Sequence, residues 1–221
     1  PPRSTLFPYT TLFRSIDPKT KQAVKTVAAR ELWFQLIHTR AETGEPYLVN
    51  IDNCNEALND FQKNLGLHVR QSNLCSEITL PTDEERTAVC CLSSVNLEYF
   101  DYWKDNEEFI FDLITMLDNI LQHFIDDVMD DRPLHVPTSL KEFMNYVPED
   151  KKGYAKAAYS AYRERAVGLG AMGFHAYLQR NNIPFSGMYA ASFNNRAFKH
   201  IKEESVNASK GLAKIDRRSV V

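Results

Sequence analysis

The sequence predicts an α/β protein, because extended runs alternate with long amphipathic helices along its 221 residues. The clearest extended run covers residues 87–97 and is rich in the β-branched and apolar residues that favour strands. The clearest helix covers residues 106–128, where apolar side chains recur at three- and four-residue spacing. A chain of this length can bury a substantial core, in one large domain or two small ones.

Composition excludes several classes of protein. The formal net charge is −3 and the pI is near 6.1, so no basic patch suggests direct contact with nucleic acid. We expect no membrane association, because no apolar run reaches the length of a membrane span and the first residues lack a signal-peptide pattern.

Four cysteines, Cys54, Cys75, Cys90 and Cys91, favour a reducing compartment. A disulfide framework is typical of small secreted chains, and this chain is not small. We therefore expect a cytoplasmic protein in which any disulfide serves chemistry. A zinc site is the weaker alternative, since the sequence has no Cys-x-x-Cys and the adjacent Cys90 and Cys91 cannot both bind one ion comfortably. We therefore predict no metal-binding residues.

Both ends look foreign to the rest of the chain. Thr5-Leu6-Phe7 recurs as Thr11-Leu12-Phe13, and the segment 1–15 resembles translated sequencing-adapter read-through. Residues 216–221 resemble the opposite adapter. We expect both segments to be non-native and leave them out of the fold prediction. The alternative is a pair of ordinary disordered termini.

The N-terminal part is predicted to be a helix followed by a strand. Apolar residues within 17–43 recur mostly at helical spacing, and Gly44 with Pro46 supplies the stop. Residues 47–51 are expected to form a strand, with Asp52-Asn53 as its turn. Cys54 follows in that polar turn, where we expect a structural or incidental role.

Polar chemistry falls on every second residue of the segment 72–82, Ser-Asn-Leu-Cys-Ser-Glu-Ile-Thr-Leu-Pro-Thr. In an extended backbone, Asn73, Cys75 and Glu77 would point the same way, each Cβ about 7 Å from the next. In a helix they would diverge. We therefore predict an extended segment that presents an amide, a thiol and a carboxylate to one small molecule. The alternative is a half-buried strand with an inert cysteine and a solvated glutamate.

In the run 87–97, alternation separates the two adjacent cysteines. Cys90 shares a face with Leu92, Ser94 and Asn96, whereas Cys91 shares one with Val89, Ser93 and Val95. Only one of the two can face Cys75. The second face is the more apolar, so Cys91 is expected to fill the core and Cys90 to face the site.

Two further patterns invite functional readings that we consider weaker. His123 and Asp127 lie four apart near the end of the predicted helix 106–128, but no second His/carboxylate pair accompanies them, so a solvated helix end is expected. Residues 168–173 match Gly-x-Gly-x-x-Gly but lack the preceding hydrophobic strand and the later acidic residue of a dinucleotide site. Close backbone packing explains these glycines. Helices are predicted at 174–180 and 188–213.

Ser72-Asn73-Leu74-Cys75-Ser76-Glu77-Ile78, followed by Leu80-Pro81-Thr82, resembles the finger-loop motif Asn-x-Cys-x-Glu of the catalytic (large) subunit of class I ribonucleotide reductase. The run 90–97 resembles the family's Cys-x-Leu-Ser-x-x-Asn-Leu strand, with its cysteine at Cys90, and 168–173 resembles a barrel strand ending in a glycine turn. The resemblance implies that residues 16–215 are part of a ten-stranded α/β barrel with a central finger loop.

The resemblance also implies a role for each residue of the motif. Cys75 matches the thiyl radical that takes the 3′-hydrogen of a ribonucleoside diphosphate. Glu77 would be the general base on the 3′-hydroxyl, and Asn73 would orient the ribose. Cys90 would supply one of the two reducing thiols and end in a disulfide. Leu74 and Ser76 complete the predicted substrate-binding segment and favour class I over the cobalamin-dependent enzymes.

The implied partners are a small radical-generating subunit, thioredoxin or glutaredoxin as reductant, and a second copy of the full-length chain. No cofactor is expected in these 221 residues. The metal-radical cofactor is expected in the small subunit, and the ATP/dNTP effector sites in regions beyond this sequence, as is the partner thiol of Cys90. We expect this piece alone to be inactive and poorly folded, because an incomplete barrel leaves open sheet edges. The alternatives are a cobalamin-dependent reductase and a non-catalytic helical interaction module.

Overall fold

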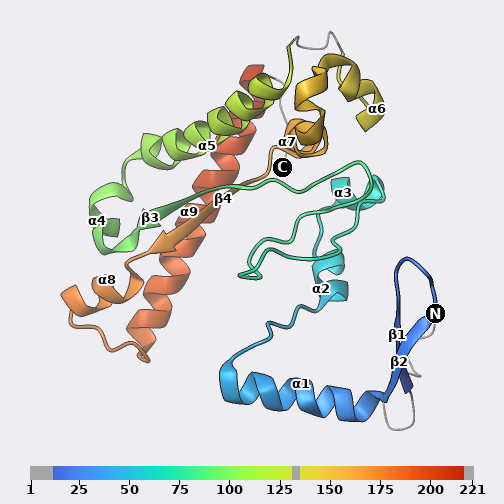
Figure 1. Ribbon diagram of the computed structural model, residues 1–221. Coiled ribbons are helices and arrows are strands. Elements are labelled where there is room, and N and C mark those ends of the chain that lie inside the picture. The colour runs from blue at the N-terminus through green and yellow to red at the C-terminus, as the bar shows by residue number, and fades with distance from the viewer. Residues whose placement is uncertain (1–11, 131–134, 217–221) are drawn as a thin grey trace.

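A computed structural model describes residues 12–130 and 135–216, and it contains helices and two small, separate two-stranded sheets (Figure 1). The strands are β1 (Leu12–Ile16), β2 (Ala23–Ala28), β3 (Cys91–Asn96) and β4 (Val167–Met172). The helices are α1 (Ala29–Thr43), α2 (Ile51–Glu56), α3 (Asp60–Asn64), α4 (Phe100–Trp103), α5 (Glu107–Val128), α6 (Leu140–Phe143), α7 (Ala155–Glu164), α8 (Phe174–Arg180) and α9 (Met188–Asp216). Short 3-10 helices cover Leu97–Tyr99, Met144–Tyr146 and Glu149–Tyr154.

The centre of the fold is the parallel pair of β3 and β4. Their register runs from Cys91 opposite Val167 to Asn96 opposite Met172. Parallel strands cannot be joined by a tight turn, so the chain crosses over through α4, α5, α6 and α7 before it returns in β4. This arrangement confirms the predicted extended character of 91–96 and the strand expected within 168–173, whereas residues 87–90 are irregular.

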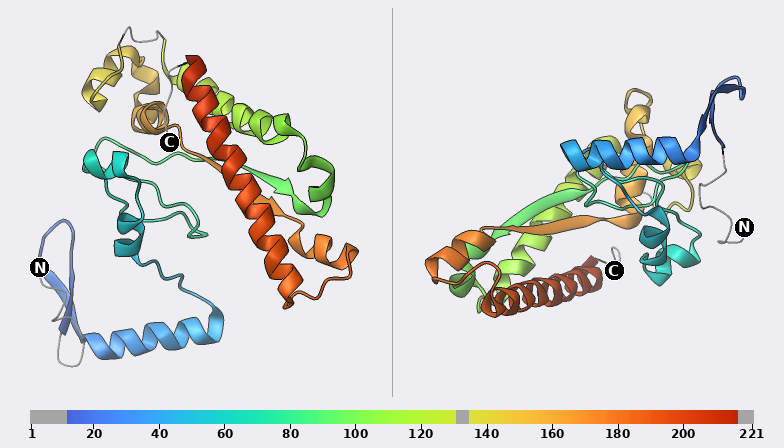
Figure 2. Two further views of the ribbon diagram at one scale, coloured as in Figure 1. Left: turned by 180° about the vertical axis from the view of Figure 1, so that it is seen from behind. Right: turned by 90° about the horizontal axis from the view of Figure 1, so that it is seen from below.

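Helix α5 connects two hydrophobic cores. Its first half packs with β3, β4, α8 and α9 around buried residues that include Leu97, Phe100 and Leu178. Its second half packs with α6 and α7 around Phe143 and Tyr159. Figure 2 shows α9 running alongside β4, with α5 next to it. The predicted helices 106–128, 174–180 and 188–213 are confirmed, and the last extends to Asp216.

A buried ion pair fixes the corner between α7 and β4. Arg165 has φ +46°, a left-handed conformation that is costly for a residue with a side chain. Its Nε donates to Asp118 Oδ1 at 2.6 Å and its Nη2 to the Asp118 carbonyl at 2.9 Å, both on α5. Its Nη1 donates to Gln122 Oε1 at 3.0 Å. Because these bonds join the corner to α5, they hold β4 in place beside β3.

The N-terminal part departs from the sequence prediction. Residues 17–43 are not one helix: α1 begins at Ala29, and residues 23–28 form β2, which pairs antiparallel with β1. The β-branched residues Val24, Thr26 and Val27 explain this, because they favour a strand once a partner lies alongside. The predicted stop is confirmed by Gly44, which ends α1 with φ +82°.

The predicted strand at 47–51 is also wrong. Residues 47–50 are irregular, and Ile51 begins α2, so Cys54 lies on a helix and not in a turn. A strand needs a hydrogen-bonded neighbour, and within the described ranges no strand pairs with these residues. Asp52 in the first turn suits a helix, because an acidic group there interacts favourably with the helix dipole.

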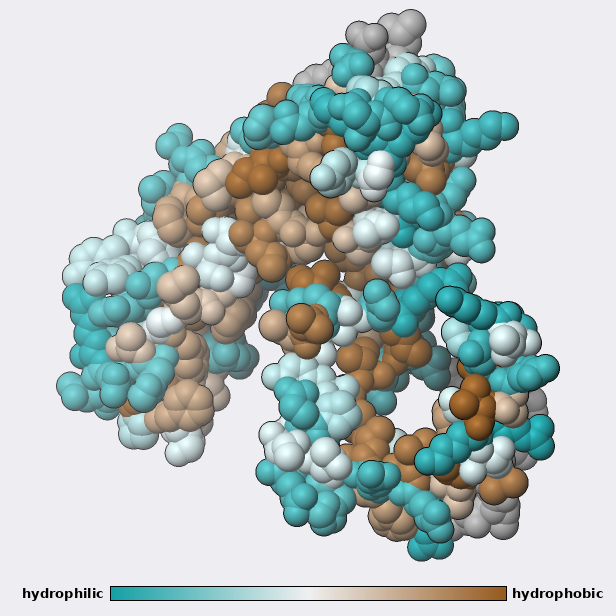
Figure 3. Space-filling view, in the orientation of Figure 1, coloured by the Kyte–Doolittle hydropathy of each residue, from teal (hydrophilic) through white to brown (hydrophobic). Residues whose placement is uncertain are grey.

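Helix α1 and the β1–β2 hairpin form an arm that stands apart from the two cores (Figures 1 and 3). No residue of α1 is buried, and Trp33 and Phe34 are about half exposed. Residues 12–15, which the sequence assigns to an adapter-derived segment, form most of β1. Their origin remains a prediction, and residues 1–11 and 217–221 lie outside the described part of the chain.

The ten-stranded barrel is not present in the described residues, which contain two separate two-stranded sheets and no closed barrel. A barrel closes only when each strand has a neighbour on both sides, and β3 and β4 each pair with one strand in the described ranges. None of the described helices has both the length and the apolar character needed to cross a bilayer.

The Arg165–Asp118 ion pair leads to a stability prediction. Arg165 and Asp118 side chains are 5% and 14% exposed. Replacing Asp118 by Ala leaves a buried cation without its carboxylate, which should lower the free energy of unfolding by about 3–5 kcal/mol. Asp112→Ala, on the exposed side of the same helix, should change it by less than about 0.5 kcal/mol. Urea denaturation followed by circular dichroism measures both, and equal effects would contradict the proposed anchor.

Candidate functional site

The segment that carries Cys75 is a tight turn and not the predicted extended row. Residues 74–75 form a turn with a bend at Ser76, whose φ is +67°. The Ser76 backbone N–H donates to the Asn73 carbonyl at 3.1 Å, and that of Asn73 donates to the Ile78 carbonyl at 3.4 Å. The chain reverses at this turn, so Asn73 and Glu77 lie close enough for their side chains to form a hydrogen bond, which an extended chain would not allow.

Two side-chain hydrogen bonds close this turn. Asn73 Nδ2 donates to Glu77 Oε1 at 2.6 Å, and the Ile78 backbone N–H donates to Asn73 Oδ1 at 3.0 Å. Leu74 is 95% exposed at the tip of the turn, and Cys75 is exposed beside it. The amide, the thiol and the carboxylate of the motif are thus held on one small, accessible turn.

The base of this segment is held at both ends. We call residues 68–82 the cysteine loop. The Thr82 backbone N–H donates to the His68 carbonyl at 3.2 Å, and Arg70 Nε donates to the Thr82 carbonyl at 3.0 Å. Asn55 on α2 exchanges two 2.9 Å hydrogen bonds with the backbone of Val69, which is 2% exposed. The cysteine loop is therefore a closed projection and not a free linker.

Cys90 lies one residue before β3 and within electrostatic reach of the cysteine loop. Its thiol is half-buried, and this burial raises its pKa, with smaller contributions in the same direction from Cys91 and Glu77. All four cysteines are free thiols in this structure.

Cys91 faces the other way, as the alternation of the run predicts. It packs against the core formed by α6, α7 and the second half of α5, and burial raises the pKa of its thiol. Leu92 and Ser94, on the face of Cys90, are exposed. One face of β3 is therefore covered by the core, and the face that carries Cys90 is open.

The glycines of the Gly-x-Gly-x-x-Gly pattern keep that open face accessible. A Cβ on Gly168 would lie 2.5 Å from Leu92 Cδ2 and 3.5 Å from Cys90 Sγ, and one on Gly170 would lie 3.2 Å from Ser94 Oγ. Gly173 has φ +76° and ends the strand before α8. Close packing accounts for the glycines, as the sequence predicts.

The remaining sequence candidates lie outside the motif turn. His123 and Asp127 form an exposed contact at 4.0 Å. In the described ranges no group of three or more His, Cys, Asp and Glu side chains is arranged to hold a metal ion. Cys54 on α2 lines a hollow with residues that include Gln62 and, from the cysteine loop itself, Thr79.

Sequence reasoning missed a buried ion-pair cluster that follows the cysteine loop. Arg86 Nη1 lies 3.0 Å from Asp83 Oδ2, and Arg86 Nε lies 3.3 Å from Glu164 Oε1 at the end of α7. The side chains of Arg86 and Glu164 are only 11% and 10% exposed. The Asp-x-x-Arg spacing was a signal for the first contact, but nothing in the sequence connects residue 86 with residue 164.

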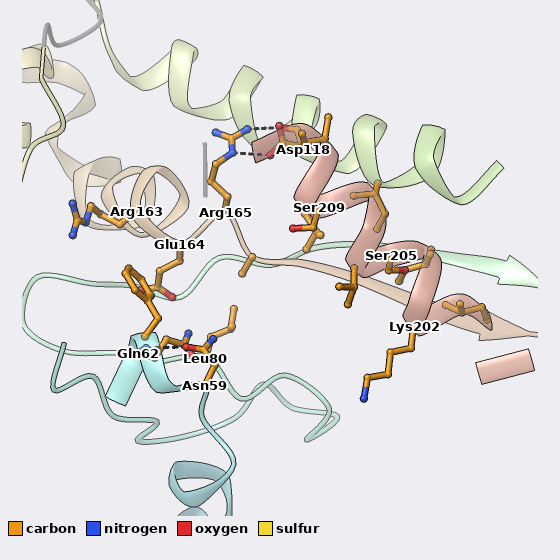
Figure 4. A pocket seen from close by; sticks show the side chains of 18 of the residues that line it. Asn59, Gln62, Leu80, Asp118, Arg163, Glu164, Arg165, Lys202, Ser205 and Ser209 are labelled. Carbon is orange, nitrogen blue, oxygen red and sulfur yellow. Dashed lines mark hydrogen bonds and ion pairs between the residues drawn. The ribbon is translucent and has the colours of Figure 1, made fainter. Parts of the chain in front are cut away.

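Glu164 also lines a cavity of about 550 Å³ between α3, α9 and the start of β4 (Figure 4). Burial raises the pKa of Glu164 to about 7, although the nearby Arg86 opposes the shift. In Figure 4 Arg163 points away from Glu164, and Arg165 reaches toward Asp118. This cavity is not formed by the residues of the cysteine loop that carry the motif.

The chemistry available at the cysteine loop is that of an exposed thiol between a hydrogen-bond donor and a carboxylate. Asn73 can orient oxygen atoms of a bound molecule, and the Glu77 carboxylate is of the type that serves as a general base. Cys90 can exchange its thiol with another thiol or disulfide nearby.

Comparison with known proteins gives consistent matches. Residues 8–220 match the family described as "Ribonucleotide reductase, barrel domain". The chain is 50% identical over 198 residues to the ribonucleoside-diphosphate reductase large subunit of Invertebrate iridescent virus 3, covering 89% of this chain and 28% of that protein. It is 44% identical over 199 residues to the putative large subunit of Frog virus 3, covering 90% and 32%.

A solved structure gives the same result. The class Id ribonucleotide reductase alpha subunit of Actinobacillus ureae superposes with a TM-score of 0.70 at 39% identity, over 84% of this chain and 32% of that one. The chain thus spans about a third of the length of these proteins.

The turn predicts a local effect of Asn73. Replacing Asn73 by Ala removes both side-chain hydrogen bonds, so amide exchange at Ile78 should accelerate at least about fivefold, given ~1 kcal/mol for one hydrogen bond. Hydrogen–deuterium exchange with mass spectrometry measures it. Ser72→Ala is the control, because Ser72 Oγ donates to the Asn73 carbonyl and does not take part in the two side-chain hydrogen bonds of Asn73. Unchanged exchange in Asn73→Ala would show that other contacts hold the turn.

The electrostatic effect of Glu77 on the pKa of Cys90 predicts a change in the reactivity of that thiol. The charge of Glu77 raises the pKa of Cys90, so Glu77→Gln should lower that pKa and speed alkylation of Cys90 by iodoacetamide at mildly alkaline pH. Peptide-resolved mass spectrometry follows the reaction at each cysteine. Glu84→Gln removes an exposed charge from the next loop and should leave the rate unchanged. A rate that does not rise in Glu77→Gln would place the carboxylate too far from Cys90.

Proposed function

The chain belongs to the ribonucleotide reductase barrel-domain family, and from that premise we propose that it is part of a catalytic subunit that reduces ribonucleoside diphosphates. The named activity of its relatives supports the substrate class. Because the chain spans only 28% and 32% of two of these proteins, the activity is proposed for the complete subunit that contains it.

One observation carries the proposal at the level of the site. The turn of the cysteine loop joins Asn73 to Glu77 through a 2.6 Å hydrogen bond and presents Cys75 between them. Replacing a ribose 2′-hydroxyl requires a hydrogen acceptor, a base and a group that orients the sugar. The three side chains supply these in one place.

Each residue has a proposed role in the reaction. A thiyl radical at Cys75 takes the hydrogen atom from C3′ of the ribose, which makes loss of water from C2′ accessible. Glu77 accepts the proton of the 3′-hydroxyl, and Asn73 holds the ribose oxygens relative to the sulfur. Leu74 and Ser76 complete the substrate-binding turn. Cys90 and a second thiol supply two electrons and two protons to the intermediate and become a disulfide.

The proposed partners follow from the same reading. A small subunit with a metal-radical cofactor would supply the oxidising equivalent that forms the thiyl radical. Thioredoxin or glutaredoxin would reduce the disulfide, and the complete chain would form a homodimer in the cytoplasm. ATP and dNTP effectors would bind outside the residues described by the structure.

The alternatives are less well supported. The class Id name of the superposed structure favours class I over a cobalamin-dependent reductase. A non-catalytic helical interaction module does not explain why amide, thiol and carboxylate converge on one exposed turn. The family match over residues 8–220 also favours the enzyme.

The role of Cys75 is tested by replacing it with Ser in the complete catalytic subunit, together with its small subunit and a dithiol reductant. Since a hydroxyl cannot replace sulfur as a reversible hydrogen acceptor, deoxyribonucleotide formation should be lost entirely. Cys90→Ser should stop turnover with a physiological reductant, because the reducing pair is incomplete. The assay measures conversion of ribonucleoside diphosphate to the deoxy product.

Cys54→Ser is the matched control, since Cys54 lies on α2 and outside the motif turn. It should retain activity near that of the unchanged enzyme. Deoxyribonucleotide formation by the Cys75→Ser enzyme would rule out the proposed function.

A further inference from the structure

The segment between the cysteine loop and β3 is short and tightly held. Asp83 Oδ1 accepts the backbone N–H groups of Glu85 and Arg86, each at 2.8 Å, which folds residues 83–86 into a compact turn. This turn directly follows Thr82, the closing residue of the cysteine loop, and only three residues separate Arg86 from Cys90. Its position therefore affects both cysteines.

Arg86 fastens this turn to α7. Its guanidinium contacts Asp83 at 3.0 Å and Glu164 at 3.3 Å, and its Cζ lies 5.4 Å from the ring centre of Tyr159, which is fully buried. The next residue, Thr87, donates its backbone N–H to the Lys156 carbonyl of α7 at 3.4 Å. We call the three charged residues Asp83, Arg86 and Glu164 the Arg86 clasp.

The other end of the clasp reaches the strand that positions Cys90. Glu164 is the last residue of α7, and β4 begins three residues later at Val167, which lies opposite Cys91. The clasp thus connects the end of the cysteine loop to α7, which leads into β4, and β4 pairs with β3. The Arg86 guanidinium is nine-tenths buried, donates a hydrogen bond to Asp83 and lies within ion-pair distance of Glu164, so its charge favours keeping the two carboxylates close together.

We propose that Arg86 is a positioning residue that holds the end of the cysteine loop against α7 and thereby sets the separation of Cys75 from Cys90. Its consequence for catalysis rests on the proposed function, in which both thiols act on one substrate. Arg86 itself does not touch that substrate. A purely structural ion pair would affect folding but not the distance between the two thiols.

The test uses the complete catalytic subunit and dibromobimane, a short reagent that cross-links neighbouring thiols, with peptide mass spectrometry to identify the Cys75–Cys90 product. Arg86→Gln should lower the rate of this cross-link about tenfold, a loss of about 1.4 kcal/mol in the closed arrangement. It should lower kcat for deoxyribonucleotide formation with little change in KM. Modification of Cys54 should be unaffected.

Arg163→Gln is the matched control. It makes the same substitution on α7, one residue before Glu164, and its Nη1 donates to the Pro137 carbonyl at 3.3 Å. It should cross-link like the unchanged protein. An unchanged cross-link rate in Arg86→Gln, an equal loss in Arg163→Gln, or no Cys75–Cys90 cross-link in the unchanged protein would each overturn the proposal.

If Arg86→Gln does not fold, the role of the clasp is tested by the pH dependence of the Cys75–Cys90 cross-link rate in Glu164→Gln. The charged groups that act electrostatically on Glu164 are Arg86 and Asp83 from the turn and Arg163 from its own helix. With a pKa near 7, Glu164 is mostly protonated at about pH 6 and mostly ionised at about pH 8. The ratio of the unchanged to the Glu164→Gln cross-link rate should therefore rise from about one at the lower pH to several-fold at the higher pH. A ratio that does not change with pH would refute the role of the clasp.

The two hypotheses fail separately. An unchanged, folded holoenzyme that makes no deoxyribonucleotide refutes the proposed function, while its cross-link rates still decide the role of Arg86. Full activity together with equal cross-link rates in Arg86→Gln and the unchanged protein refutes the positioning role alone.

Discussion

The parallel pairing of β3 with β4 is the constraint on which the rest of the structure depends. It requires a long crossover, and α5 supplies the core on one face of the pair. It also brings Gly168 opposite Leu92 and Gly170 opposite Ser94, where side chains in place of the glycine hydrogens would crowd the side chains of β3. The open face that remains carries Cys90. The position of this thiol is therefore a consequence of strand register and of two missing Cβ atoms.

The cysteine loop depends on this frame but is built differently. Its reactive groups are organised by local hydrogen bonds, and its base is fixed by Asn55 on one side and by the turn 83–86 on the other. Buried charges then connect the parts: Arg165 joins β4 to α5, and Arg86 joins the loop end to α7. Such pairs contribute little net stability when their desolvation is counted, but they are costly to break and so favour one arrangement.

Periodic elements of the fold could be predicted from the sequence, whereas elements that depend on a distant partner could not. The apolar stripe of α5 and the glycine stop of α1 are local signals, and the structure confirms both. Residues 23–28 were predicted to be helical because their apolar spacing fits a helix, but pairing with β1 makes them a strand. The Arg86–Glu164 contact joins residues 78 apart in the sequence, which no local pattern records.

The motif illustrates why a correct family assignment can rest on an incorrect local geometry. In an extended chain Asn73 and Glu77 would be separated by about 13 Å along the backbone, four times the rise of a strand residue. Their side chains instead meet at 2.6 Å, because Ser76 adopts a left-handed conformation and reverses the chain. The spacing Asn-x-Cys-x-Glu specifies which residue types converge, and the turn brings them closer than a strand would. A tight turn also leaves Cys75 exposed while its neighbours Asn73 and Glu77 hold each other in place, so the thiol combines access with fixed surroundings.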